Sequence, residues 1–257
     1  MKHLTILILT IIVILVFSSC KMMYKPTMQN VPLMQKEGDL KTSLSYNNYQ
    51  IAYATSNNTA VMLNGHYNRN QWASSLSDTT TTNEYDTKRW SVDGGAGYYR
   101  PFSDFVFETY GGGGYGSYDY DYDVYKFDTY VQTKEYNVQT WRGFIQPSIG
   151  YCTDYADIAF STRLMYVGFF NPTSSNYNQD ELIDEKLTDL EQYTYTFIEP
   201  ALTIRCGIPK GKLHTQLIYA YKINPQEINY WRFNLNVGIT INISEFYNQQ
   251  SDSSFEN

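Results

Sequence analysis

The feature that most constrains the fold is a strict alternation of polar and apolar residues close to the C-terminus. Between Trp231 and Ile243 every odd-numbered residue is apolar, whereas the even-numbered ones are polar apart from Gly238. Successive side chains of a β-strand point to opposite faces, so this pattern predicts a strand with one apolar and one polar face. At roughly 3.3 Å per residue the strand would be about 43 Å long, and a tilt of about 45° would give it a rise of about 30 Å. That rise is enough to cross the apolar core of a bilayer, and a strand of a soluble sandwich rarely needs such a length.

The N-terminus has the pattern of a secretory signal. Lys2 starts a short positive stretch, residues 4–17 are apolar, and two serines come directly before Cys20. The apolar run is shorter than the roughly 20 residues that a spanning helix needs, which favours a cleaved signal over an uncleaved anchor helix. The residues Phe17-Ser18-Ser19-Cys20 resemble the bacterial lipobox, and this resemblance implies cleavage before Cys20 and attachment of lipid to it. We therefore assign residues 1–19 to a lipoprotein signal peptide and residues 20–38 to a lipidated tether.

Composition is compatible with a membrane barrel and gives no sign of a nucleic-acid partner. The mean hydropathy is -0.44, but a barrel exposes only half of each strand to lipid, so its average hydropathy stays low. The chain contains 26 tyrosines, and rings of aromatic side chains at two membrane interfaces would use many of them. A net charge of -7 gives no reason to expect binding to nucleic acid.

Similar alternation elsewhere predicts ten strands. They cover residues 40–46, 49–55, 59–67, 88–100, 105–118, 136–151, 155–170, 193–208, 212–223 and 231–243. An even number returns both ends of the sheet to the same side, as in bacterial single-chain barrels. Eight strands remain possible if residues 40–55 form one bulged strand and an end strand is misread.

The predicted connections are long on one side and short on the other. The long loops cover residues 68–87, 119–135 and 171–192, and the third contains a helical pattern over residues 179–191. Turns near residues 57, 102, 153 and 210 are short. This asymmetry predicts an all-β, closed, antiparallel, up-and-down transmembrane β-barrel over residues 39–247, followed by a polar tail over residues 248–257.

Several stretches carry a resemblance to a known class of protein. They are Asn30-Val31-Pro32-Leu33, Gly38-Asp39-Leu40, Tyr53-Ala54 and Ala60-Val61-Met62-Leu63-Asn64-Gly65. Over roughly residues 30–246 the chain resembles bacterial outer-membrane β-barrel proteins of the lipid-anchored sort common in Bacteroidetes-type genomes. Its last strand resembles the C-terminal assembly signal that the barrel-insertion machinery reads, with Asn236 as the polar residue, Gly238 as the glycine, and Ile241 and Ile243 as the closing apolar pair. The polar tail after Tyr247 departs from the many barrels that stop at the final strand.

The polar faces of the predicted strands collect charges of both signs. These interior residues are Asp93, Glu108, Arg163, Glu199, Arg205 and Arg232. Unpaired charges in a dry interior would be very unfavourable, so they should pair with one another or be hydrated. Because a barrel of eight to ten strands is nearly filled by its own side chains, we expect a network that closes the interior, with a hydrated, weakly selective pore as the alternative.

Two features could carry chemistry or binding in the outer loops. His66, with Ser74, Ser75 and Asp78 in the following loop, could form a hydrolase site at the outer rim. In the stretch Tyr118-Asp119-Tyr120-Asp121-Tyr122-Asp123 the residue types alternate strictly. Asp119, Asp121 and Asp123 could bind a hard cation, although a solvated acidic face is favoured, and tyrosine-rich surfaces suit contacts with proteins or glycans.

Together with the resemblance, these observations predict an outer-membrane lipoprotein with a structural or surface interaction role, anchored by lipid at Cys20. We expect no enzymatic activity, cofactor or metal. The expected partners are outer-membrane lipids, the barrel-insertion and lipoprotein-sorting machineries, and a protein or glycan at the tyrosine-rich loops. The alternatives are a small porin-like channel, a barrel hydrolase and a soluble periplasmic ligand-binding barrel.

Overall fold

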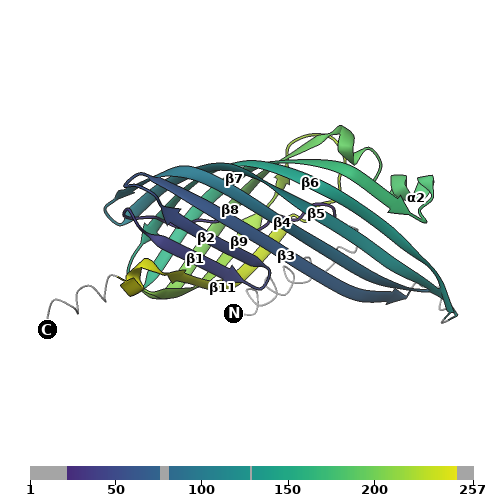
Figure 1. Ribbon diagram of the computed structural model, residues 1–257, viewed down its shortest axis with the longest axis horizontal. Helices are drawn as coiled ribbons and strands as arrows, with labels where there is room; N and C mark the ends of the chain where they lie inside the picture. The colour runs from purple at the N-terminus through teal and green to yellow at the C-terminus, as the bar shows by residue number, and fades with distance from the viewer. Residues whose placement is uncertain (1–21, 76–80, 128, 248–257) are drawn as a thin grey trace, which may run out of the picture.

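A closed antiparallel β-barrel forms most of the computed structural model, which describes residues 22–75, 81–127 and 129–247 (Figure 1). The strands are β1 (Leu40–Ser45), β2 (Asn48–Ala54), β3 (Thr59–Ser75), β4 (Thr81–Phe102), β5 (Phe105–Lys126), β6 (Thr129–Cys152), β7 (Ala156–Ser175), β8 (Thr194–Ile208), β9 (Gly211–Tyr219), β10 (Tyr221–Lys222) and β11 (Phe233–Asn242). Consecutive strands pair from β1 to β9, β9 pairs with β11, and β11 returns to β1. Since β10 continues β9 along β8 in the same register, the ring has ten positions, and the predicted ten-stranded barrel is confirmed.

The two faces of each strand differ as the alternation predicts. On β11, Leu235 and Val237 are 63% and 61% exposed on the outside, while Asn234 and Asn236 are buried in the lumen. Outward apolar side chains of the other strands continue this surface around the barrel, and we call it the outer belt. Two aromatic groups border the belt. Phe105 contacts Tyr151 on the side of the short turns, and Tyr115 contacts Trp90 on the opposite side.

The belt has the height of a membrane barrel. Phe105 and Tyr115 are ten residues apart on β5. They are separated by about 33 Å along the strand at roughly 3.3 Å per residue, or about 23 Å vertically at a tilt of about 45°. An outer-membrane barrel has an apolar band about 25 Å tall. Among the described residues, none of the helices is both long and apolar enough to cross a bilayer.

The wall of the barrel is uneven in height. β1 and β2 have 6 and 7 residues, whereas β5 and β6 have 22 and 24. Beyond the aromatic group at Trp90 and Tyr115, β3 to β6 continue as an extension, which we call the projecting sheet and which lies to the right in Figure 1. The end of β7 pairs with β6 at the base of this extension. The prediction of long loops over residues 68–87 and 119–135 is therefore wrong. Their polar composition resembles a loop, but pairing between neighbouring strands keeps most of them in the sheet.

The third long loop is present and packs on the inner face of the projecting sheet. It contains the helix α2 (Gln179–Asp184), which a capping box between Asn178 and Glu181 begins, and the 3-10 helix η1 (Leu190–Gln192). The predicted helix over residues 179–191 thus begins at the expected residue but is divided in two. Leu187 and Leu190 are buried against this face, where Tyr136 donates a hydrogen bond of 3.3 Å to the Leu187 carbonyl.

The residues before β1 lie inside the barrel. We call residues 23–34 the luminal segment, because most of its side chains are buried among the inward-facing residues of the strands. The prediction that residues 20–38 form a tether is therefore wrong for residues 23–34, whereas residues 35–38 are exposed between the lumen and β1. A segment surrounded by polar wall residues needs no hydrophobic period, and this is why its sequence resembles a linker.

Candidate functional site: an occupied lumen and a projecting sheet

The luminal segment enters at the end of the barrel that carries the long loops. The Met23 amide donates a hydrogen bond of 2.8 Å to the Asn229 carbonyl, and Tyr24 forms a parallel β-bridge with Tyr230 in the loop before β11. The ring of Tyr24 stacks on Phe197 with 4.0 Å between centroids. Its hydroxyl donates to the Glu199 carboxylate. The long-loop end of the segment is therefore held by both its backbone and its side chain.

Wall side chains bind the backbone in the middle of the segment. The Gln216 amide accepts from the Gln29 backbone N–H at 2.8 Å and donates to the Gln29 carbonyl at 3.0 Å. Ser161 donates to the Gln29 side chain at 2.7 Å, and Gln146 donates to the Asn30 carbonyl at 2.7 Å. These contacts replace the hydrogen bonds that a neighbouring strand or water would otherwise supply.

The segment leaves at the end of the barrel that carries the short turns. Arg205 donates to the Val31 carbonyl at 2.5 Å, and Lys41 donates to the Leu33 carbonyl at 2.7 Å. Glu108 accepts from the Met34 amide at 2.8 Å. Together with the contacts above, these bonds show that the segment passes through the whole lumen, from the long-loop end to the short-turn end.

Five of the six predicted interior charges are buried in the lumen. Arg163 binds Glu199 at 2.7 Å, and Asp93 binds Arg142 at 3.0 Å. Arg205 lies 3.9 Å from Asp157, which also accepts from Lys212 at 2.7 Å. The five buried residues are Asp93, Glu108, Arg163, Glu199 and Arg205.

Arg232 is not part of this network. It is exposed in the loop before β11, and its guanidinium lies 6.0 Å from the Tyr230 ring centroid. The alternation suggests an inward position, but β11 begins only at Phe233. The partners that the prediction missed are Arg142 and Asp157. Both could have been predicted from the alternation, because each lies an even number of residues from inward-facing residues of its own strand.

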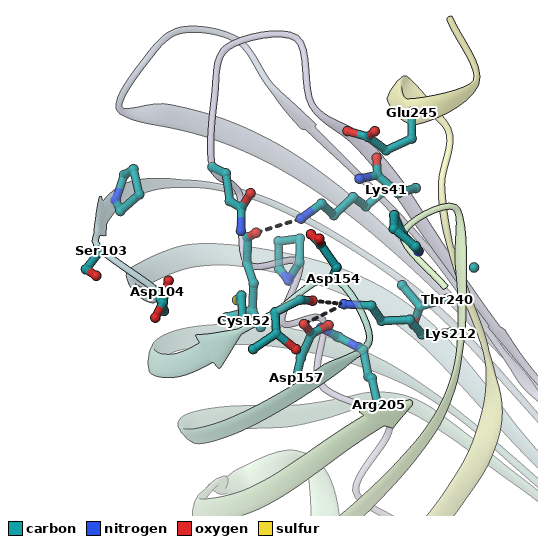
Figure 2. Close-up of a pocket in the computed structure, with 18 residues that line it drawn as sticks. Lys41, Ser103, Asp104, Cys152, Asp154, Asp157, Arg205, Lys212, Thr240 and Glu245 are labelled. Atoms are coloured by element: carbon teal, nitrogen blue, oxygen red, sulfur yellow. Dashed lines mark hydrogen bonds and ion pairs between the residues drawn. The ribbon is translucent and has the colours of Figure 1, made fainter. Parts of the chain in front are cut away.

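A cavity of about 590 Å³ lies at the short-turn end of the barrel, where Cys152, Asp157 and Lys212 line it (Figure 2). Leu33, Lys41, Cys152, Asp157, Arg205 and Lys212 are among its lining residues. Lys212 bridges the Asp157 carboxylate and the Thr153 carbonyl, at 2.7 and 2.6 Å. Asp157, Arg205 and Lys212 are thus engaged with one another, and Pro32 and Leu33 of the luminal segment also line the cavity.

The predicted hydrolase arrangement does not form. His66 is buried in the lumen, where its Nδ1 lies 3.2 Å from the Asn48 Oδ1. Ser74 and Ser75 lie eight and nine residues further along β3, or about 26 Å and more from His66 at roughly 3.3 Å per residue. Asp78 lies outside the described residues. Neither Ser74 nor Ser75 can therefore reach the imidazole.

The three predicted cation ligands lie on the outer face of the projecting sheet. Residues on one face of a strand are about 6.6 Å apart, so Asp119, Asp121 and Asp123 cannot converge on one ion. Asp119 accepts from Ser117 at 3.1 Å, and Asp123 accepts from Thr133 at 2.5 Å. Within the described residues, no group of three or more His, Cys, Asp or Glu side chains is placed to hold a metal ion.

Asp121 occupies the least favourable electrostatic position of the three. It pairs across the strands with Asp86 on β4 and Glu135 on β6. Partial burial, followed by the negative charge of Glu135, raises the pKa of Asp121 above its ordinary value. Repulsion within this row of carboxylates therefore destabilises the projecting sheet at neutral pH.

Tyrosines occupy the inner face of the projecting sheet, as the alternation predicts. Tyr118, Tyr120 and Tyr122 follow one another on β5, and Tyr85 stacks on Tyr122 with 5.3 Å between centroids. Tyr177, from the loop before α2, lies edge-on to Tyr122 at 6.1 Å. These rings form a continuous layer between the lumen and the end of the sheet.

The β5–β6 connection presents exposed aromatic side chains at the far end of this sheet. Phe127 is 79% exposed and Tyr130 is 54% exposed, and Val131 beside them is also exposed. We call these three residues the hairpin tip. It is well separated from the outer belt, so its exposure has no simple explanation in contact with a bilayer.

The residues of the predicted assembly signal close the ring. Asn236 accepts from the Asn48 side chain at 3.0 Å inside the lumen. A Cβ at Gly238 would lie 2.1 Å from the Leu44 carbonyl oxygen, so this position on β11 has no room for a side chain. Ile241 pairs with Thr42, and the Ile243 amide donates to the Leu40 carbonyl at 2.8 Å. Cys20, the predicted lipidation site, and the tail over residues 248–257 lie outside the described residues.

Comparison with known proteins identifies no family for this chain. No family model matches the chain, and no curated protein matches it. Among solved structures, the chain is similar to BauA, the ferric preacinetobactin receptor from Acinetobacter baumannii, with a TM-score of 0.33 and 11% sequence identity. The similarity covers 87% of this chain and 40% of the receptor, so the chain spans less than half of the length of that structure.

Proposed function

We propose that this chain is an outer-membrane β-barrel lipoprotein that acts at the cell surface as an interaction protein, and not as a channel or an enzyme. The observation that carries the proposal is the combination of a lumen occupied along its length with a sheet that projects beyond the outer belt. The barrel serves as an anchor, and the projecting sheet carries the part of the molecule that meets a partner.

The outer belt supports the membrane location. Leu213, Leu217 and Ile208 are among many large apolar side chains that are exposed on the outside of the barrel. In water such a surface would favour aggregation, whereas acyl chains would cover it. The lipobox-like residues before Cys20 support acylation and passage through the lipoprotein-sorting machinery. The last strand supports insertion by the barrel-insertion machinery.

The occupied lumen argues against a porin-like channel. Ions could pass only if the hydrogen bonds of Gln29 with Gln216 and of Met34 with Glu108 were broken. The position of His66 argues against the hydrolase, because Asn48 is the side chain that its Nδ1 contacts.

The hairpin tip is the part of the projecting sheet best suited to a partner. Exposed aromatic side chains supply apolar contact area at a low cost in conformational entropy, and Tyr adds a hydroxyl that can bind protein or glycan groups. A structural role without any partner is the second candidate, and the test below separates the two.

The first experiment tests the membrane barrel. The mature protein should fractionate with outer membranes, require detergent to remain monomeric and migrate differently on gels before and after boiling. A monomer that stays soluble without detergent would exclude the outer-membrane assignment and favour the soluble periplasmic barrel.

The second experiment tests the interaction role. Whole cells that display the protein would be tested for binding to panels of extracellular proteins and glycans, with Phe127→Ser/Tyr130→Ser as the variant. Tyr155→Ser, at an exposed short turn on the other end of the barrel, is the matched control. We expect the tip variant to lose binding and the control to retain it. Wild-type cells that bind nothing above background would leave only the structural role.

A further inference from the structure

The path of the luminal segment determines on which side of the barrel the preceding residues lie. The segment runs from Met23 at the long-loop end to Met34 at the short-turn end, and the chain then enters β1 from the short-turn side. Cys20 precedes Met23 by three residues. Three residues span at most about 11 Å even when fully extended.

That reach is too short for Cys20 to return to the short-turn end. The luminal segment itself covers about 36 Å at roughly 3.3 Å per residue, and it already occupies the lumen that such a return would need. The long-loop end of the segment is also firmly held. The Trp231 amide donates to the Tyr24 carbonyl at 2.8 Å, and Arg89 donates to the Met22 carbonyl.

The low part of the wall gives a route from this end of the lumen to the bilayer. A cavity of about 270 Å³ lies over the β1–β2 turn and is lined by Lys25 of the luminal segment and Tyr46 of the turn. Leu235 and Val237, which face outward from β11, line it as well. At this place the luminal segment therefore lies next to the outer belt.

We infer that the lipid on Cys20 is inserted on the long-loop side of the membrane, so that the luminal segment threads the barrel and holds the lipid in the leaflet nearer to the projecting sheet. The inference rests on the proposed acylation of Cys20 in an outer-membrane barrel and adds the side on which the lipid lies. When the long loops face outward, the lipid is in the outer leaflet of the outer membrane.

Labelling of introduced cysteines on intact cells tests on which side of the membrane the luminal segment begins. The full chain would carry Met22→Cys at the start of the luminal segment, with Phe127→Cys and Asp104→Cys as references for the long-loop and short-turn ends. A maleimide that cannot cross membranes would be applied before and after permeabilisation, with the wild-type signal from Cys152 and Cys206 subtracted. We expect Met22→Cys to react on intact cells together with Phe127→Cys, and Asp104→Cys to react only after permeabilisation.

A parallel measurement separates failure of the inference from failure of the proposed function. Metabolic labelling with a fatty acid should mark the wild-type protein and each labelled variant, and Cys20→Ala should abolish the mark. If the mark is present but Met22→Cys reacts only together with Asp104→Cys, the threaded arrangement is wrong and the acylated barrel stands. If Cys20→Ala leaves the mark unchanged or none is seen, the acylation and the inference both fail.

Discussion

At the scale of single residues, the run of glycines from Gly111 to Gly114 makes room for lumen side chains. A Cβ at Gly112 would lie 2.8 Å from the Phe144 ring and 2.1 Å from the Gly94 carbonyl oxygen. A Cβ at Gly114 would lie 2.2 Å from the Asp93 carboxylate and 2.3 Å from the Val92 carbonyl oxygen. The strand pairs regularly through this region, so the glycines allow close approach of two strands and do not mark a bulge.

We expect Gly114→Ala to destabilise the barrel by about 1–3 kcal/mol, because backbone atoms would have to move to admit the methyl group. Gly111→Ala is the matched control, since its Cβ would lie 3.8 Å from the nearest heavy atom. The measurement is the temperature at which the folded, fast-migrating gel form is lost. Equal transition temperatures for the two variants would contradict the close-approach explanation.

The raised pKa of Asp121 predicts that the stability of the projecting sheet depends on pH. Its folded-state pKa is raised by burial and by Glu135, so the wild-type sheet is relatively more stable at low pH and loses this contribution as the pH rises through the folded pKa. Asp121→Asn should therefore stabilise the projecting sheet at pH 7, by about 0.5 kcal/mol, and have little effect at pH 3. Protection factors from hydrogen exchange of the β5 and β6 amides would measure this, with Asp104→Asn at an exposed turn as the control. An equal effect at both pH values would contradict it.

At the scale of elements, a buried ion pair between two wall strands, β7 and β8, also contacts the luminal segment. Glu199 binds Arg163, and the same two side chains also contact Tyr24 and the Thr27 carbonyl. Removing one charge leaves the other buried without a partner, whereas removing both does not.

We therefore expect Glu199→Gln to cost about 3–5 kcal/mol and the double variant Arg163→Met/Glu199→Met to regain most of that loss. Unfolding in detergent, followed by intrinsic fluorescence, would compare them. Glu245→Gln is the control, because its contact with Lys36 is 3.9 Å long and exposed, and such pairs contribute at most about 1 kcal/mol. A double variant less stable than Glu199→Gln would show that the pair stabilises the fold on balance.

At the scale of the whole molecule, we expect the luminal segment to block the lumen of the barrel to ions. Replacing residues 23–34 by a Gly/Ser stretch of equal length keeps the connection to β1 but removes the segment's side chains from the lumen. The hydrogen bonds of Tyr24 with Glu199, of Gln29 with Ser161 and of Asn30 with Asn64 are lost with them. We expect this variant to conduct ions in planar bilayers, because polar wall residues would then face an open lumen. The wild-type protein should show no stable conductance, and a silent variant that still inserts would mean that the wall side chains alone close the lumen.

Structure could be predicted from the sequence wherever apolar and polar residues alternate regularly along a strand. Alternation of period two gave the ring of ten strands and placed Glu108 and Arg205 in the lumen, because side-chain direction in a strand depends only on parity. It could not place the luminal segment, whose contacts join residues as distant as Gln29 and Gln216. The same period did not identify residues 68–87 as strands, since polar strands that pair beyond the outer belt have the composition of loops.

The unequal strand lengths of the barrel wall determine how much apolar height each flank offers to lipid. A strand of 6 or 7 residues, tilted by about 45°, rises only about 14–16 Å, less than the roughly 25 Å of a typical apolar band. If the barrel spans a membrane as proposed, acyl chains beside β1 and β2 must shorten or splay to avoid leaving polar groups in contact with hydrocarbon, while chains beside β5 and β6 need not. The bilayer around this barrel is thus expected to be thinned on one flank only, and the barrel to be tipped toward that flank.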